Sequence, residues 1–263
     1  MVDVVTSVNC RNCGAPLQLR PGEVIITCEY CGTAFNQATD AAFVLRHSLV
    51  PNNLTGDSTR DLVRAWMKGG TKPPTLHREA RFESVVLTYM PFFVIDIKAR
   101  TSYRGGMTRT GGWVSREGVM EREYFWKVLA RRGTTFPTRE YDIPISAKVP
   151  FDLSRVPEGC RFLNSEMDED EAVAVAKREI EETHRYVLSR DVDRLDSLET
   201  EFEVDEVEFL HAPVWEVRYI FRGKPYDVLV DGGARDVIRG DVPPPDTSMR
   251  GFLGTLRSAL LGD

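Results

Sequence analysis

Apolar and polar residues alternate along two long stretches of the chain, residues 83–100 and 204–221. A period of two is typical of β-strands, because successive side chains of a strand point to opposite faces of its sheet. Each stretch contains one proline, Pro91 or Pro213, which lacks the N–H that a central strand donates. The pattern therefore predicts two long strands, each bulged or interrupted at its proline.

Apolar residues at helical spacing precede each predicted strand. Residues 58–61 (Ser-Thr-Arg-Asp) and 165–168 (Ser-Glu-Met-Asp) have the form of a capping box, which predicts a helix start at each place. The order of helix and long strand thus occurs twice. It predicts an internal duplication in which Pro91 and Pro213 are equivalent and Phe93 and Trp215 are both buried. The alternative is that two unrelated hairpins share a common pattern. A short strand is also expected at residues 43–45.

The C-terminal part adds a hairpin and an amphipathic tail. Residues 226–240 alternate on both sides of an Asp-Gly-Gly turn and predict the hairpin. Three prolines at 243–245 then precede apolar residues at helical spacing: Phe252, Leu253, Leu256, Leu260 and Leu261. We expect this helix either to dock on a protein partner or to pack on its own chain. Peripheral membrane contact is disfavoured, because its two arginines are too few to attract anionic lipid strongly.

Two Cys-x-x-Cys pairs lie near the N-terminus, with fourteen residues between them. A structural zinc ion takes four thiolate or imidazole ligands in a tetrahedron. The intervening residues are expected to form a hairpin around Pro21-Gly22 that brings the pairs together, and a glycine follows each pair. We expect Cys10, Cys13, Cys28 and Cys31 to bind one Zn²⁺ in a zinc ribbon. Cys10→Ser is then expected to unfold roughly the first 35 residues and leave the rest folded.

Other uses of these cysteines are a pair of disulfides, an iron site of the rubredoxin type and a redox dithiol. Five cysteines and the lack of a signal-peptide pattern disfavour disulfides. A redox dithiol needs only one Cys-x-x-Cys pair. Cys160 is left over and has no predicted role.

The formal net charge of −6 conceals a basic segment, because residues 98–139 hold ten lysines and arginines against three glutamates. Aromatic residues interleave with these arginines, as in platforms that bind single-stranded nucleic acid. The candidate contacts, for nucleic acid or for a protein partner, are Arg104, Arg109, Trp113, Arg131 and Arg132. One alternative is that the aromatic residues face the core and the arginines face water. Another is that the arginines pair with the acidic runs at 166–171 and 199–208. We favour pairing within the chain or with a protein over nucleic acid.

The sequence contains no pattern that predicts catalysis. The histidines at 47, 77, 184 and 211 lack the spacing of a metal-binding motif, and no nucleophile elbow or phosphate loop is present. No apolar run is long enough to predict a membrane-spanning helix. We therefore expect a cytoplasmic protein that is not an enzyme.

Several motifs occur in one order: the ribbon, the sequence LRHSLVPNN before a capped helix with a tryptophan, the strand YMPFFVID, and the closing FRGKPYDVLVDGGARDVIRGDVP. In this order the chain resembles a broad group of prokaryotic zinc-ribbon proteins of unassigned function. The closing hairpin is similar to helix-plus-sheet modules of the PepSY type. It departs from them at residues 233–236, where Gly-Ala-Arg-Asp replaces the usual Thr-Gly. The resemblance implies no catalytic residue.

Together these patterns predict an α+β fold with four parts. They are a zinc ribbon (residues 1–36), two related helix-plus-antiparallel-sheet units (37–150 and 151–242), and a proline spacer with an amphipathic helix (243–263). The expected function is that of a non-enzymatic adaptor or regulatory protein acting through protein contacts. The alternative is a nucleic-acid-binding protein that uses the ribbon and residues 98–139.

Overall fold

The computed structural model describes residues 6–37, 46–109 and 112–244. The strand expected at 43–45 and the amphipathic tail, including Phe252, Leu253, Leu256 and Leu260, lie outside these residues. The fold is mixed α and β and is dominated by an eight-stranded sheet. No helix in the described ranges is both long and apolar enough to span a membrane.

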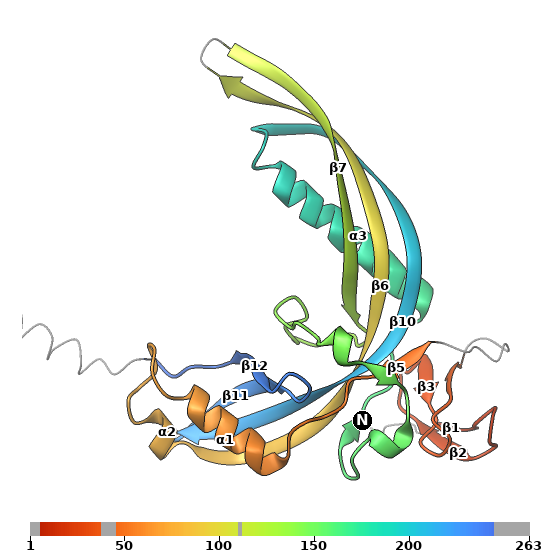
Figure 1. Ribbon diagram of the computed structural model, residues 1–263, viewed down its shortest axis with the longest axis vertical. Helices are drawn as coiled ribbons and strands as arrows, with labels where there is room; N and C mark the ends of the chain where they lie inside the picture. Colours follow the sequence, from red (N-terminus) through yellow and green to blue (C-terminus); the bar gives the residue numbers. More distant parts are fainter. Residues whose placement is uncertain (1–5, 38–45, 110–111, 245–263) are drawn as a thin grey trace, which may run out of the picture.

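Three long strands form a curved arch with two arms (Figure 1). They are β6 (Arg81–Arg109), β7 (Gly112–Leu129) and β10 (Arg194–Phe221). β6 and β10 pair antiparallel along almost their whole length and so run through both arms. β7 joins β6 in one arm. In the other arm β11 (Lys224–Asp231) joins β10, and β12 (Asp236–Gly240) joins β11.

Helices cover one face of this sheet in each arm. α1 (Gly56–Trp66) and α2 (Leu76–Glu79) pack against the arm that contains β11, and α3 (Glu169–Leu188) packs against the arm that contains β7. The buried residues of α3 follow helical spacing, so one stripe faces the sheet: Ala172, Ala176, Ile180, His184 and Leu188. On the other face, residues 131–147 cross the centre of the sheet, where Tyr141 and Ile143 are buried in a cluster with Phe92.

Both helix starts differ from the sequence prediction. α1 begins after Thr55, whose hydroxyl accepts a hydrogen bond from the Ser58 N–H, and Ser58 accepts one from the Thr55 N–H in return. Ser58 is therefore the third residue of the helix and not its cap. α3 begins after Asp168, which accepts a bond of 2.9 Å from the Glu171 N–H. Ser165 is instead buried and donates to the Met167 carbonyl. Both observed caps are residue types that favour this position.

The two prolines lie near the middle of the β6–β10 pair, where the arms meet. Pro91 is opposite His211, and Pro213 is opposite Tyr89. The two prolines therefore stand at matching places on either side of the centre of the strand pair. The residues two positions beyond them are both buried, as the sequence predicted: Phe93 and Trp215.

Matching backbone hydrogen bonds surround this centre. Ala130 donates its N–H to the Pro91 carbonyl at 2.9 Å, and Gly232 donates its N–H to the Pro213 carbonyl at 2.8 Å. The carbonyls of Ala130 and Gly232 in turn accept bonds of 2.8 and 2.7 Å, from the N–H groups of residues 166 and 53. The same pair of bonds thus links β6 and the end of its hairpin strand β7 to the segment before α3, and links β10 and the end of its hairpin strand β11 to the segment before α1.

Short segments complete the sheet at the same centre. β5 (His47–Leu49) lies parallel to β10, and β9 (Arg161–Phe162) lies parallel to β6. β8 (Val149–Pro150) pairs with β5. Two single-turn 3-10 helices flank β8: Ile145–Ala147 and Leu153–Arg155. The order short strand, helix, long strand and hairpin strand therefore occurs twice, first as β5, α1, β6 and β7 and then as β9, α3, β10 and β11. Each short strand pairs with the long strand of the other set, β5 with β10 and β9 with β6.

Candidate metal centre

The four cysteines of the two Cys-x-x-Cys pairs lie in the turns of two small hairpins. β1 (Thr6–Asn9) pairs with β2 (Pro16–Leu19), and β3 (Ile25–Thr27) pairs with β4 (Ala34–Asn36). The prediction of a hairpin around Pro21-Gly22 was wrong. The two strands beside Pro21-Gly22 do not pair with each other, because β2 pairs with β1 and β3 pairs with β4. The strands that the sequence suggested on both sides of Pro21-Gly22 do form.

The two cysteine turns share one backbone geometry. Gly14 donates its N–H to the Cys10 carbonyl and Gly32 donates its N–H to the Cys28 carbonyl, both at 2.8 Å. The two glycines have φ values of +74° and +75°, in the left-handed region that other residues rarely adopt. A glycine after each pair is therefore a requirement of the turn.

The four thiols are close enough to hold one metal ion. Their Sγ atoms all lie within 4.8 Å of one another. Two of the separations, Cys10 to Cys31 and Cys13 to Cys28, are 3.7 Å. A tetrahedral ion with metal–sulfur bonds of about 2.3 Å places its sulfurs about 3.8 Å apart. The set therefore fits a single tetrahedral ion, with Cys10 and Cys28 buried and Cys13 and Cys31 exposed.

The surroundings of the thiols differ. Cys31 has the Thr33 hydroxyl at 3.4 Å and the Asn12 side-chain amide at 3.6 Å. Hydrogen bonding to Thr33 lowers the pKa of Cys31 to about 6. Burial raises the pKa of Cys28 to about 12, although the Tyr30 N–H points at its sulfur from 3.4 Å. Cys31 is thus a thiolate donor near neutral pH, whereas Cys28 gives up its proton when a cation stabilises the thiolate.

The second hairpin is fastened to the body of the protein. Ser165 exchanges backbone hydrogen bonds with the start of β3 and the residue before it: it accepts from the Val24 N–H at 2.7 Å and donates to the Ile25 carbonyl at 3.1 Å. The Thr27 N–H donates to the side chain of Asn164 at 3.0 Å. Ile25 is 1% exposed and belongs to the core cluster that contains Phe93. The metal centre therefore supports a segment that is part of the main core.

Gly32 lies beside Phe151 of the main body, and a substitution there tests how closely the two are packed. A Cβ added there would lie 3.1 Å from the Phe151 ring, whereas one added at Gly14 has no atom within 4 Å. Both Gly→Ala changes force alanine into the left-handed region, at about 1–2 kcal/mol. We expect Gly32→Ala to lower the free energy of unfolding by more than Gly14→Ala does, as measured by urea titration. Equal losses would show that the Phe151 ring moves away from the added methyl group at no cost in stability.

The candidate residues of the basic segment are not gathered into one site. They lie in ion pairs with glutamates: Arg104 with Glu117 at 3.4 Å, Arg131 with Glu166 at 2.8 Å, and Arg132 with Glu171. The Trp113 side chain, at the tip of one arm, stacks with Arg194 at 4.8 Å. The side chain of Arg109 is outside the described residues. Pairing of the basic segment with the acidic run 166–171 is present at Arg131 and Arg132, whereas Arg104 pairs with a glutamate of the basic segment itself.

Two histidines meet at the centre of the fold, although they are 164 residues apart. His211 Nε2 lies 2.9 Å from the Leu163 carbonyl and must donate to it. His211 Nδ1 therefore accepts from His47 Nε2, at 2.8 Å. Burial lowers the pKa of His47 to about 2 and that of His211 to about 3, so both rings are neutral at physiological pH. Their rings stack on Phe151 and Phe162, with centroids 3.9 and 4.1 Å apart.

The other buried histidine, His184 on α3, also has structural partners. Its ring nitrogens lie 2.6 Å from the Thr101 hydroxyl and 2.8 Å from the Tyr124 hydroxyl. None of these histidine contacts was detectable in the sequence, because each depends on strand register between distant segments.

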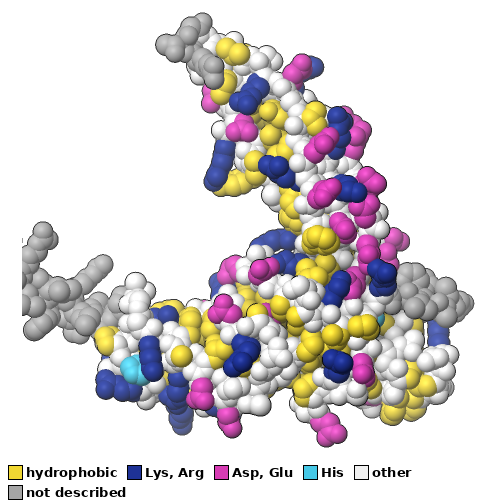
Figure 2. Space-filling view, viewed as in Figure 1, with side chains coloured by type: hydrophobic (Ala, Val, Ile, Leu, Met, Phe, Trp, Pro, Cys, Tyr) yellow, Lys and Arg dark blue, Asp and Glu magenta, His cyan; other side chains and the backbone are white. Residues whose placement is uncertain are grey.

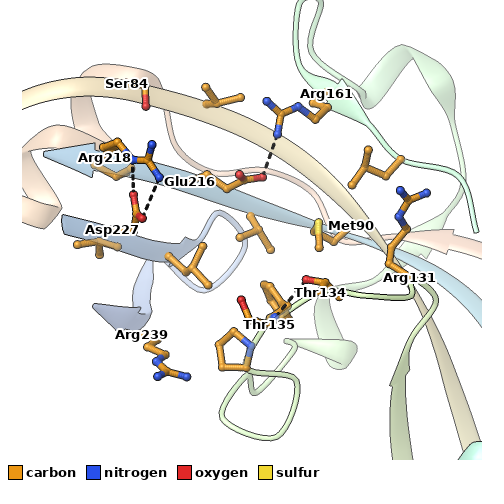
Figure 3. Close-up of a pocket in the computed structure, with 18 of the residues that line it drawn as sticks. Ser84, Met90, Arg131, Thr134, Thr135, Arg161, Glu216, Arg218, Asp227 and Arg239 are labelled. Atoms are coloured by element: carbon orange, nitrogen blue, oxygen red, sulfur yellow. Dashed lines mark hydrogen bonds and ion pairs between the residues drawn. The ribbon is translucent and has the colours of Figure 1, made fainter. Parts of the chain in front are cut away.

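A groove of about 720 Å³ lies on the sheet face that α1 does not cover (Figure 3). Its floor carries ion pairs on β10, where Arg218 forms two bonds with Asp227 and Glu216 lies 3.4 Å from Arg161. Arg131 and Arg239 stand at its rim and pair with Glu166 and Glu140. The charges of the groove are therefore largely compensated from within the chain.

Comparison with known proteins identifies no relative. No protein-family model matches the chain, and no curated protein or solved structure matches it.

Proposed function

We propose that the protein is a non-enzymatic, zinc-stabilised adaptor or regulatory protein that acts through protein contacts. The observation that carries this proposal is the closed set of four cysteine sulfurs. Catalytic zinc sites keep one position for water or substrate, whereas structural sites use four protein ligands. A metal held by all four thiolates has no open position for chemistry, and its role is to fix the ribbon against the core.

Zinc is the metal that we propose for this site. Four thiolates at tetrahedral spacing suit zinc or an iron of the rubredoxin type. We expect one zinc per chain by elemental analysis, with metal–sulfur distances of about 2.3 Å by X-ray absorption. Replacement by Co²⁺ is expected to give the absorption bands of a tetrahedral tetrathiolate. One iron per chain instead of zinc, or fewer than four sulfur ligands, would contradict the assignment.

We also propose that the two sets of short strand, helix, long strand and hairpin strand arose by duplication. The support is the matching pattern of hydrogen bonds around Pro91 and Pro213. A duplicated unit of this kind yields the two arms of one curved arch, which meet at a shared centre (Figure 1). Such arms offer long surfaces for protein contacts, as an adaptor requires.

Affinity purification of the full chain from its native cell tests the functional proposal. We expect protein partners that remain bound after nuclease treatment. Partners that disappear with nuclease would favour the nucleic-acid alternative instead. A matched preparation of Cys28→Ser shows which partners depend on the folded ribbon, and recovery of the chain with no specific partner would contradict the adaptor role.

A further inference from the structure

One edge of β10 is open over about half of the strand. β6 pairs with one side of β10 from Arg194 to Ile220. On the other side, β11 covers 214–221 and β5 covers 209–211. No other described strand pairs with residues 194–208. Open edges present unpaired N–H and C=O groups, which can add a strand from another chain.

Just before the part of this edge that β5 covers, the segments that lead into β5 and β8 bring cations to the carboxylates of β10. Arg46, the residue before β5, forms an ion pair with Glu206. Lys148, the residue before β8, forms an ion pair with Glu208, which is 6% exposed. The chain itself therefore shows how acidic side chains of β10 are neutralised when a segment lies along this edge.

Along residues 199–203 the cations beside the glutamates come from the inner strand β6: Arg100 is opposite Glu201, and Lys98 is opposite Glu203 but pairs with Asp205 at 2.7 Å. Glu199, Glu201 and Glu203 alternate along β10 and therefore share one face. The nearest cation to Glu201 is Arg100 on the inner strand β6, at 3.8 Å. No ion pair within 4 Å reaches Glu199 or Glu203 among the residues that the structure places. Figure 2 shows several acidic side chains along this convex side of the arm, with basic side chains between them.

The opposite face of the same stretch is apolar. Phe202 and Val204 are half-buried and pack against the core under α3. A strand added here would place alternate side chains beside the three glutamates and the remaining ones beside Phe202 and Val204. In the same arm, β7 pairs with β6 on one side only. Its outer edge carries both arginines and glutamates, so it favours neither a basic nor an acidic partner.

We propose that the open edge of β10, residues 197–204, binds an extended segment of a partner protein in which basic and apolar residues alternate. The segment adds as a strand, and its lysines or arginines pair with Glu199, Glu201 and Glu203. This inference rests on the proposed adaptor function and names the chemistry of its partner. Charged residues on an open edge can also serve only to prevent aggregation, and the experiment separates these roles.

The test measures fluorescence anisotropy of labelled peptides with the full chain at low salt. A peptide that alternates lysine with valine is expected to bind, and its counterpart with glutamate in place of lysine is not. A third peptide keeps the lysines but replaces alternate valines with proline, which cannot complete the ladder of hydrogen bonds. We expect it to bind at least about tenfold more weakly. Equal binding of the valine and proline peptides would overturn strand addition and leave only non-specific attraction.

Two charge-reversal variants locate the site. Glu199→Lys, Glu201→Lys and Glu203→Lys together are expected to weaken binding of the lysine–valine peptide by about tenfold or more, because like charges then face each other. The control changes three exposed acids elsewhere by the same charge: Asp61→Lys, Glu158→Lys and Glu182→Lys. We expect it to bind within about twofold of the wild type.

Three outcomes would overturn the edge proposal: no binding of the lysine–valine peptide, equal weakening by both variants, or no weakening by the edge variant. The functional proposal is judged separately, by the native partners. If they stay bound to the edge variant, the adaptor role stands and the edge proposal fails. If neither variant nor wild type retains any partner, the adaptor role itself fails.

Discussion

Cys28→Ser is expected to abolish metal binding and to unfold the ribbon. Cys28 is fully buried, and its sulfur lies 3.7 Å from Cys13 within the four-thiol set. Serine removes one thiolate from a closed tetrahedron. Binding of structural zinc contributes about 10–16 kcal/mol in zinc-finger peptides, so a small ribbon without its metal does not remain folded. Elemental analysis and tryptic digestion of the N-terminal segment measure the two effects.

The same change is expected to lower the melting temperature of the rest of the protein. The sequence alone suggested that the ribbon unfolds independently. The structure instead places Ile25 in the main core and joins β3 to Ser165 by backbone hydrogen bonds. Loss of a buried isoleucine contact typically destabilises a core by about 2–5 kcal/mol. We therefore expect a folded but less stable body, measured by thermal unfolding.

Cys160→Ser is the matched control, because Cys160 lies outside the four-thiol set and is only half-buried. It is expected to keep one metal per chain and a nearly unchanged melting temperature. A Cys28→Ser protein that still binds one metal per chain would exclude a four-cysteine site. An unchanged melting temperature in that variant would exclude the coupling through Ile25.

Strand and ligand positions were predictable because they depend on local sequence. Alternation over residues 83–100 and 204–221 identified roughly the first two-thirds of β6 and the last two-thirds of β10, since one buried face imposes a period of two. The true strands extend further into the arm that contains β7, where the face towards α3 also carries polar residues such as Thr101 and Thr200, which share a hydrogen bond of 2.8 Å. The cysteine spacing identified all four members of the thiol set.

Pairing was not predictable, because it depends on contacts between distant segments. Nothing in the sequence around His47 or His211 indicates that their rings share a hydrogen bond. The strands beside Pro21-Gly22 were recognised, but their partners were wrong because β1 and β4 are too short to stand out from their surroundings. Helix starts were displaced by three residues where Thr55 and Asp168 competed with nearby serines for the capping position.

The histidine pair makes the centre of the fold sensitive to acid. Both pKa values fall from an ordinary value of 6.5 to about 2 for His47 and about 3 for His211, chiefly because burial disfavours the charged ring. In the unfolded chain both rings take up protons below about pH 6.5, whereas in the folded chain they do not. The stability that they contribute is therefore complete above pH 6.5 and is lost as the pH falls towards 3.

His211→Gln is expected to reduce this pH dependence. Glutamine can still accept from His47 and donate to the Leu163 carbonyl, but it does not titrate. Each histidine contributes at most about 1.4 kcal/mol per pH unit to the loss of the free energy of unfolding between pH 6 and 4. We expect the slope of that free energy, measured by urea titration at each pH, to fall by about this amount.

The remaining slope in His211→Gln should come in part from His47, whose pKa burial also lowers. His77→Gln, on α2 and away from this cluster, is the matched control and is expected to leave the slope unchanged. If His211→Gln and His77→Gln show the wild-type slope alike, His211 takes up a proton in the folded protein as easily as in the unfolded chain. The hydrogen-bonded neutral pair would then be the wrong description of the centre of the arch.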